Sequence, residues 1–344
     1  MPAMSARRQN LVGASVFVLL AAMLPNAPLS ALEAVNPYRL IQEIQIGGEG
    51  FWDYLSIDSA ARRLYVAHAT HAEVIDLDHN TLVGRIADTP GIHGVAVAAD
   101  IRRLYTSNGR EATASIVDAA TLKTEARVAT GAGPDTILYE PGQQEVYTFN
   151  GRAHSVTVFN ARTGVVLTTI ALPGVPEFAV VDAAAGRVYA NIEDHSLVVA
   201  IDTQRHAIVE TWPAAPCMGA SGLALDAIHQ RLFLGCENNM MAMMDSSNGK
   251  VLAQVPIGHG VDASAFDPVT QLAFSSCGDG TLTIAHEDSP DILRLVQTLA
   301  TAAGARTMSI DPQSHRIYLA VGDRAAGAAG RAYDNFRVLV YGME

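Results

Sequence analysis

Charged and aromatic residues are few in this 344-residue chain, at 17% and 6%, and only three residues are cysteine. Low charge with ordinary numbers of glycine and proline excludes a globally disordered chain and a collagen-like one. Positive charge is especially scarce, because 23 lysines and arginines face 35 aspartates and glutamates, for a net charge of -12. A surface this acidic repels phosphate backbones, so duplex DNA or RNA is a poor candidate partner.

Long apolar runs are also absent, apart from one near the N-terminus. Residues 11–24 are mostly apolar, follow Arg7 and Arg8, and precede a small-residue segment that ends at Ala31. This pattern predicts a secretory signal peptide over residues 1–31, and the alternative is an uncleaved membrane anchor. We therefore expect residues 32–344 to form one domain that is periplasmic or secreted, with no membrane span in the mature chain.

A repeat of 40 to 44 residues fills the rest of the chain. Each unit has an aromatic residue at the same position of the repeat, which we call its anchor. The anchors are Tyr65, Tyr105, Tyr147, Tyr189, Phe233, Phe274 and Tyr318. Seven residues earlier six units have an acid, typical of a turn: Asp58, Glu140, Asp182, Asp226, Asp267 and Asp311. Short β-rich segments between turn residues, without a helical period, predict an all-β fold, the seven-bladed β-propeller.

The two ends of the repeat region complement each other. The last unit contains only three strand-like segments, and residues 38–46 form an unpaired one before the first unit. Pairing this N-terminal strand with the last blade would close the ring and remove an exposed sheet edge.

Several segments resemble a known propeller repeat. Residues 57–66, 74–77 and 81–86 are similar to the YVTN β-propeller repeat, and residues 38–344 as a whole resemble exported bacterial proteins related to YncE. Residues 47–54 and 278–283 are similar to that group too. The resemblance implies the propeller architecture, whereas it implies little about function because this architecture hosts unrelated activities.

One polar residue per blade is expected at the mouth of the central channel, where the innermost strands begin. The position twelve residues before each anchor holds the seven residues that we call the mouth ring: Asp53, His93, Asp135, Glu177, Ser221, Asp262 and Arg306. Six of the seven are ionisable, whereas Ser221 interrupts the series. Three residues after the anchors, or beside that position, lie further candidate ligand-binding residues: His68, Asn108, Arg110, Asn150 and Arg152.

Three interpretations of the mouth ring remain open. In the first, a divalent cation (Ca²⁺, Mg²⁺, Mn²⁺, Fe²⁺ or Zn²⁺) is bound by the acids and imidazole of the ring, namely Asp53, His93, Asp135, Glu177 and Asp262. In the second, the pocket is metal-free and Arg306, Arg110 and Arg152 hold a carboxylate or sugar acid. In the third, the ring only solvates the mouth or caps strand ends.

The leading functional prediction is an exported propeller that binds a small polar molecule at this acidic mouth. One alternative is a metal-dependent lactonase or lyase, with Asp135 or Glu177 as base and His93 as acid. Another is a scaffold that binds an envelope component or protein through its rim loops. The sequence has no Gly-x-Ser-x-Gly and no Cys-x-x-Cys-His motif, so serine nucleophile and c-type haem chemistry are unsupported.

The repeat register also pairs the cysteines. It places Cys217 and Cys236 at the same rim of the fifth blade and Cys277 in the sixth. An exported protein favours oxidised cysteines, so we expect a Cys217–Cys236 disulfide and a free Cys277 thiol. The alternative is three free, buried thiols.

Overall fold

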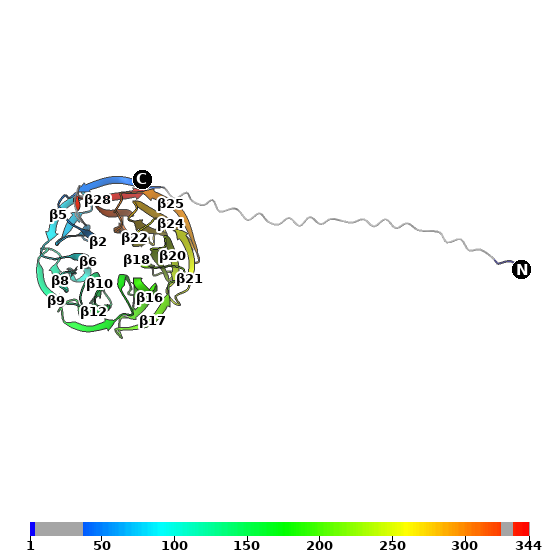
Figure 1. Cartoon of the computed structure of the whole chain (residues 1–344), viewed down its shortest axis with the longest axis horizontal. Coiled ribbons are helices and arrows are strands. Elements are labelled where there is room, and N and C mark those ends of the chain that lie inside the picture. The colour runs from blue at the N-terminus through cyan, green and yellow to red at the C-terminus, as the bar shows by residue number, and fades with distance from the viewer. Residues whose placement is uncertain (4–36, 325–332, 344) are drawn as a thin grey trace. The chain divides into compact units, whose positions relative to one another are not determined.

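The computed structural model describes residues 1–3, 37–324 and 333–343. The chain divides into two compact units, Met1–Val35 and Asn36–Glu344, and every strand of the described residues lies in the second. The predicted signal peptide therefore falls outside the described residues, except for its first three. Within the second unit, seven antiparallel four-stranded sheets surround a centre as the blades of a propeller (Figure 1). The predicted all-β, seven-bladed fold is confirmed.

The blades follow the order of the repeats. Blade 1 contains β2 (Trp52–Asp58), β3 (Arg63–His68), β4 (His71–Asp76) and β5 (Thr81–Ile86). Blade 2 contains β6 (Ile92–Ala98), β7 (Arg103–Asn108), β8 (Thr113–Asp118) and β9 (Thr124–Ala129). Blade 3 contains β10 (Pro134–Glu140), β11 (Glu145–Asn150), β12 (Ser155–Asn160) and β13 (Val166–Ala171). Blade 4 contains β14 (Pro176–Asp182), β15 (Arg187–Ile192), β16 (Leu197–Asp202) and β17 (Ala207–Pro213).

The remaining blades repeat this arrangement. Blade 5 contains β18 (Ala220–Asp226), β19 (Arg231–Cys236), β20 (Met240–Asp245) and β21 (Val251–Pro256). Blade 6 contains β22 (Val261–Asp267), β23 (Leu272–Cys277), β24 (Thr281–Ser289) and β25 (Ile292–Ala300). Blade 7 contains β26 (Met308–Asp311), β27 (Arg316–Arg324), β28 (Tyr333–Met343) and β1 (Tyr38–Gln45). Two single 3₁₀ turns, η1 (Ala99–Ile101) and η2 (Glu193–His195), complete the described elements.

The N-terminal strand closes the ring as predicted. β1 pairs antiparallel with β28, with Tyr38 opposite Met343. The Tyr38 side chain is buried, its hydroxyl donates to the His315 carbonyl at 2.9 Å, and its ring meets that of Phe274 edge to face. The last blade is therefore built from both ends of the repeat region, and β1 covers the edge of β28 that would otherwise be exposed.

The aromatic anchors fill the interfaces between blades. All seven are buried, and two of them also bond to the next blade along the chain. The Tyr105 hydroxyl donates to the Ala161 carbonyl at 2.7 Å, and the Tyr189 hydroxyl donates to the Ser246 carbonyl at 3.2 Å. Each blade thus packs both of its faces against neighbours.

The cysteine prediction is confirmed. Cys217 and Cys236 form a disulfide across the rim of blade 5, and Cys277 is a buried free thiol in blade 6. A helix with the length and apolarity needed to cross a membrane does not occur in the described part of the chain.

Candidate functional site

The innermost strands of the blades meet around the central channel. β2, β6, β10, β14, β18, β22 and β26 form this inner ring, and each contacts the next until β26 meets β2 again. In six blades the register with the second strand shifts at the mouth-ring residue. The shifts lie between Trp52/Leu55, Ile92/Val95, Pro134/Ile137, Pro176/Ala179, Ala220/Gly222 and Val261/Ala263. These β-bulges turn the mouth-ring side chains out of the sheet, a use that bulges commonly have beside binding sites.

His93 joins the first three blades at the mouth. Its Nδ1 lies 2.7 Å from Asp53 Oδ2 and 3.4 Å from Asp135 Oδ1. Burial lowers the pKa of His93, but the hydrogen bond to Asp53 and the charge of Asp135 outweigh it and raise the pKa to about 9. The imidazole is therefore a cation at neutral pH when nothing else neutralises the two carboxylates.

The other acids of the mouth ring are difficult to ionise. Burial and the neighbouring carboxylates raise the pKa of both Asp135 and Glu177 well above the ordinary range. Burial also raises the pKa of Asp262 to about 6, although Arg306 opposes it. The mouth concentrates more negative charge than its own cations offset, which predicts bound protons or a bound cation.

Blade 7 supplies the arginine of the ring. Arg306 Nε lies 2.7 Å from Asp262 Oδ2, and its guanidinium lies over the Phe51 ring at 5.5 Å. This arginine neutralises one acid on the side of the ring away from His93.

Blade 5 holds a carboxylate although its own ring residue is neutral. The Ser221 hydroxyl donates to Glu193 Oε1 at 3.1 Å. Glu193 begins η2 in blade 4, and burial raises its pKa. The apparent gap at Ser221 is therefore occupied by an acid from the neighbouring blade.

A tyrosine forms the floor of the site. Tyr54 follows Asp53 in blade 1, yet its hydroxyl lies 3.4 Å from Glu177 Oε1 in blade 4 and donates to it. The buried Tyr54 ring also meets Phe178 edge to face, with 5.0 Å between centroids. Because blades 1 and 4 lie on opposite sides of the ring, these two aromatic rings meet across the channel.

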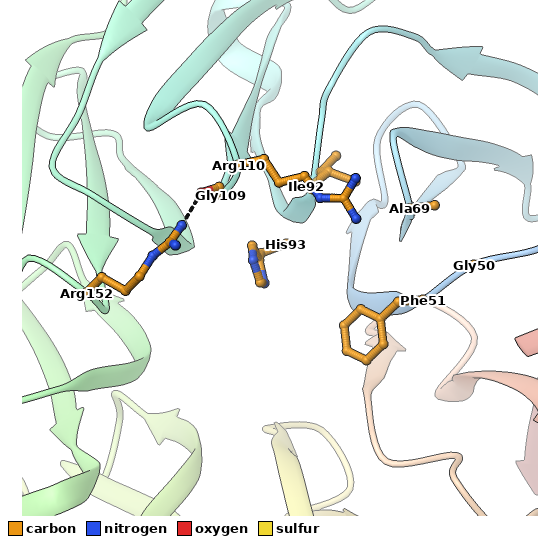
Figure 2. Close-up of a pocket in the computed structure, with 9 residues that line it drawn as sticks. Gly50, Phe51, Ala69, Ile92, His93, Gly109, Arg110 and Arg152 are labelled. Atoms are coloured by element: carbon orange, nitrogen blue, oxygen red, sulfur yellow. Dashed lines mark hydrogen bonds between the residues drawn. The ribbon is translucent and has the colours of Figure 1, made fainter. Parts of the chain in front are cut away.

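Two arginines line the wall above His93. A cavity of about 460 Å³ is bounded by Phe51, His93, Arg110 and Arg152, and Figure 2 shows the other three around His93. Arg152 crosses from blade 3 to blade 2, where it donates to the Gly109 carbonyl at 2.7 Å. A second cavity of about 740 Å³ continues from His93 and Arg152 to Asp135. Cationic side chains beside the acids of the mouth ring suit a ligand with both a cationic and an anionic group.

The structure does not bring three of the predicted ligand-binding residues to the mouth. His68, Asn108 and Asn150 are fully buried within their blades. The Asn108 amide donates to the Ser115 hydroxyl, and the Asn150 amide donates to the Thr157 hydroxyl. His68 lies 3.5 Å from the buried carboxylate of Glu73. Both faces of each blade are covered, so a residue three positions past an anchor is buried as the anchor is.

Tyr54 and Phe51 were missed because they lie outside the register of the mouth ring. One sequence signal does mark the mouth loops, since glycine lies two residues before the ring position in five blades. These glycines are Gly91, Gly133, Gly219, Gly260 and Gly304. At Gly91 and Gly133, φ is +66° and +65°, and an added Cβ would meet Arg110 and Arg152 respectively. The two glycines therefore let these arginines pack against the mouth loops.

Comparisons with known proteins support the fold. No protein-family model matches the sequence, and no curated protein matches it significantly. Among solved structures, Kuenenia stuttgartiensis hydrazine synthase is similar, with a TM-score of 0.69 and 14% identity over 77% of this chain and 91% of that one. At this identity the likeness shows the propeller and does not extend to a ligand or reaction.

Proposed function

We propose that this protein is an exported, YncE-like propeller that binds a small polar ligand through a divalent cation at the mouth of its channel. The observation that carries the proposal is the cluster of Asp53, His93 and Asp135, whose ligand atoms all lie within 4.8 Å of one another. Three consecutive blades each contribute one of these atoms. Such convergence at the same register position is what a shared ligand requires.

The donor set fits a cation by a second criterion. Asp135 Oδ1 is buried and makes no hydrogen bond to any residue in the described ranges, and its nearest cation is the His93 Nδ1 at 3.4 Å. A buried carboxylate oxygen without a donor is costly, and a bound cation would offset that cost. Two carboxylates and one imidazole suit Mn²⁺, Fe²⁺ or Zn²⁺ better than Ca²⁺ or Mg²⁺.

The surroundings indicate an anionic group on the ligand. Arg110 and Arg152 lie on the wall of the cavity, and within the described residues neither forms an ion pair with an acid. A carboxylate or sugar acid that reaches the cation would meet both guanidiniums. When bound, the cation would polarise the ligand oxygens, while Tyr54 and Phe178 would exclude water from below.

The disulfide supports export. Cys217–Cys236 is stable in an oxidising compartment and is unusual in a reducing cytoplasm. The proposed location, the periplasm or the exterior, agrees with the signal-like residues 1–31 and with the resemblance to exported YVTN-repeat proteins.

Metal analysis of the purified protein tests the proposal. We expect metal-free protein to bind Mn²⁺ or Zn²⁺ at the mouth, and the variant Asp135→Asn to weaken that binding at least about tenfold. Asp118→Asn, which changes an exposed turn acid, is the matched control and should bind as the wild type does. If calorimetry detects no Asp135-dependent binding of any of the five cations, the cation is excluded and a metal-free anion pocket remains.

A metal-dependent lactonase or lyase is the second candidate function. It is favoured by the raised pKa values of Asp135 and Glu177. These values lie nearer neutral pH, where a general acid or base works best. In that case one carboxylate would accept a proton and His93 would return it. Turnover of a lactone panel that is lost in Asp135→Asn would support an enzyme, and tight binding without turnover would support a ligand-binding protein.

A further inference from the structure

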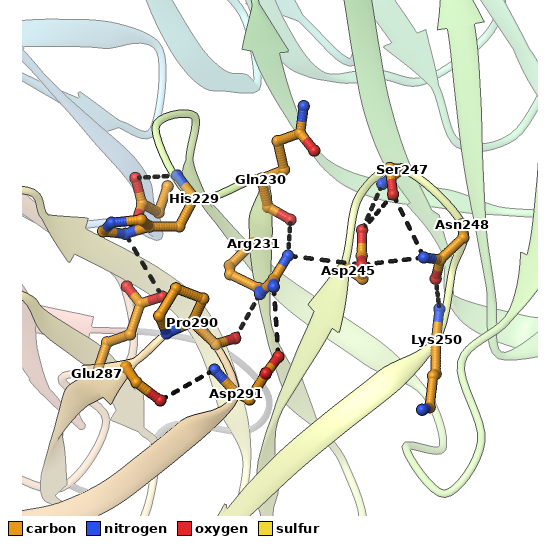
Figure 3. A network of polar contacts seen from close by, with 12 residues as sticks. His229, Gln230, Arg231, Asp245, Ser247, Asn248, Lys250, Glu287, Pro290 and Asp291 are labelled. Atoms are coloured by element: carbon orange, nitrogen blue, oxygen red, sulfur yellow. Dashed lines mark hydrogen bonds and ion pairs between the residues drawn. The ribbon is translucent and has the colours of Figure 1, made fainter.

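A second cluster of ligating side chains lies at the opposite end of β18 from Ser221. It consists of Asp226 at the end of β18, His229 in the following turn, and Glu287 on β24 of the next blade. His229 Nδ1 lies 2.6 Å from Asp226 Oδ2 and 3.8 Å from Glu287 Oε1. Figure 3 shows Glu287 directed toward His229 across the interface of blades 5 and 6.

Glu287 is buried without a hydrogen-bond donor. Its residue is only 3% exposed, and among the residues described neither carboxylate oxygen has a hydrogen-bond partner. Asp226, also buried, is its acidic neighbour, and burial together with this neighbour raises the pKa of Glu287 to about 7. Two adjacent buried carboxyl groups need a proton or a cation between them.

The nearby arginine does not provide that cation. Arg231 donates to the Pro290 carbonyl, and its terminal nitrogens lie 3.6 Å from Asp245 and 3.4 Å from Asp291 (Figure 3). Its guanidinium is therefore directed at these groups, and no ion pair joins it to Glu287 within the described ranges.

The repeat supplies an internal control for Glu287. In six blades one residue at or near the end of the third strand donates its backbone N–H to the carbonyl of the residue that precedes the second strand. These equivalent residues are Leu77, Ala119, Ala161, Thr203, Ser246 and Glu287. Five of them carry no charge, so the blade does not require an acid here. The acid in blade 6 therefore calls for an explanation other than folding of the repeat.

We propose that Asp226, His229 and Glu287 form a second divalent-cation site that joins blades 5 and 6. Two carboxylates and an imidazole favour a metal of intermediate softness, and we take Mn²⁺ and Zn²⁺ as probes. The cation replaces the proton on His229 Nδ1. Because zinc–ligand bonds are about 2.0–2.2 Å, it also lengthens the 2.6 Å contact between Asp226 and His229. The His229 side chain is 35% exposed and provides the entry path.

This site is independent of the mouth ring, so the two can be tested separately. Calorimetry with Zn²⁺ and electron paramagnetic resonance with Mn²⁺ would count the equivalents bound by metal-free protein. We expect Glu287→Ala to lose one equivalent that Asp135→Asn retains, and the double variant to lose both. Glu287→Ala should fold, because alanine is the natural residue at this position in blades 2 and 3. Asp182→Asn is the control, since Asp182 is the equivalent turn acid of blade 4 and the residue of the next blade that is equivalent to Glu287 is the neutral Ser246.

A second readout reports the link between blades. Added Zn²⁺ should slow amide hydrogen exchange in the β18–β19 turn of the wild type and leave the exchange in Glu287→Ala unchanged. Equal metal stoichiometry in wild type and Glu287→Ala would overturn the proposal. A second outcome would also overturn it, namely a wild type that binds no metal at this site but loses melting temperature as the pH rises through about 7, while Glu287→Ala does not. That result would mean that Asp226 and Glu287 share a proton instead of a cation.

Discussion

The imidazole Nδ1 of His93 lies 2.7 Å from the carboxylate of Asp53, and this contact joins the first two blades at the channel mouth. His93 also lies 3.4 Å from Asp135 in the third blade. A proton on the imidazole is therefore what holds the acids of three blades together when no other cation is present. A divalent cation would compete with that proton, which makes both the stability and the metal affinity of the mouth depend on pH.

Raising the pH from about 5 to about 9 is expected to lower the melting temperature of the metal-free protein. The pKa of Asp262 is raised to about 6 and that of His93 to about 9, and those of Asp135 and Glu177 are raised too. The folded state thus holds protons that the unfolded chain has released. The stability from these groups is complete below their ordinary pKa values and is lost as the pH rises through the raised ones. Scanning fluorimetry over a pH series measures this slope.

Glu177→Gln is the informative variant for this dependence. Glutamine stays neutral at every pH, so the variant should gain relative stability on the alkaline side and show a shallower slope. Added Mn²⁺ or Zn²⁺ should stabilise the wild type more at high pH than at low pH, because protons compete for the same atoms. Identical slopes in the two proteins would contradict the raised pKa of Glu177.

A side chain at Gly91, the glycine before the mouth ring in blade 2, should destabilise the protein. Gly91→Ala places a Cβ 2.6 Å from Arg110 Cγ at a φ of +66°. Gly47→Ala is the control, because Gly47 has a φ of +74° but no atom within 4 Å of the added Cβ. We expect the control to lose about 1–2 kcal/mol from backbone strain alone, and Gly91→Ala to lose about 1 kcal/mol more. Urea unfolding measures both, and equal losses would show that Arg110 yields freely.

The mouth ring could be predicted because the repeat fixes the register of every blade. Counting back from the anchor Tyr65 locates Asp53, and the same count locates His93 and Asp135 in the next two blades. Closure by β1 follows equally well, since an orphan strand and a three-stranded blade complete each other. These predictions need only the repeat length and the pattern of strands.

Side-chain direction and contacts between blades could not be predicted in this way. The β-bulges at six of the seven mouth-ring residues follow from tertiary packing and leave little trace in residue type. Simple alternation could not show that Asn108 and Asn150 are buried, because both faces of a blade are covered. The contacts of Ser221 with Glu193 and of Tyr54 with Glu177 depend on the distance between blades, which the sequence does not encode locally.

The cysteines should differ sharply in reactivity. Burial raises the pKa of the Cys277 thiol to about 12, so the thiol should resist a thiol reagent in the native protein. It should react with the reagent after the protein is unfolded in urea. Replacing Cys217 and Cys236 together with serine removes a cross-link between residues 19 apart and should cost about 2–5 kcal/mol. Cys277→Ser is the control that abolishes labelling in urea. Native labelling of the wild type would show that blade 6 opens readily.

Closure of the ring should depend on a single tyrosine of β1. Tyr38 is 1% exposed, donates to the His315 carbonyl, and packs against Phe274 of blade 6, so it holds the N-terminal strand against two blades. Tyr38→Ala creates a cavity and leaves the partly buried His315 carbonyl without its donor, which should cost about 3–5 kcal/mol of unfolding free energy.

Leu40→Ala is the matched control for this strand, because Leu40 belongs to the same strand and is 45% exposed. It should change the unfolding free energy by less than about 0.5 kcal/mol. Hydrogen exchange should further show that Tyr38→Ala frees the amides of β28, since that strand becomes the edge of the last blade when β1 detaches. Equal stability of the two variants would mean that β1 is held by its backbone hydrogen bonds, with no dependence on the Tyr38 side chain.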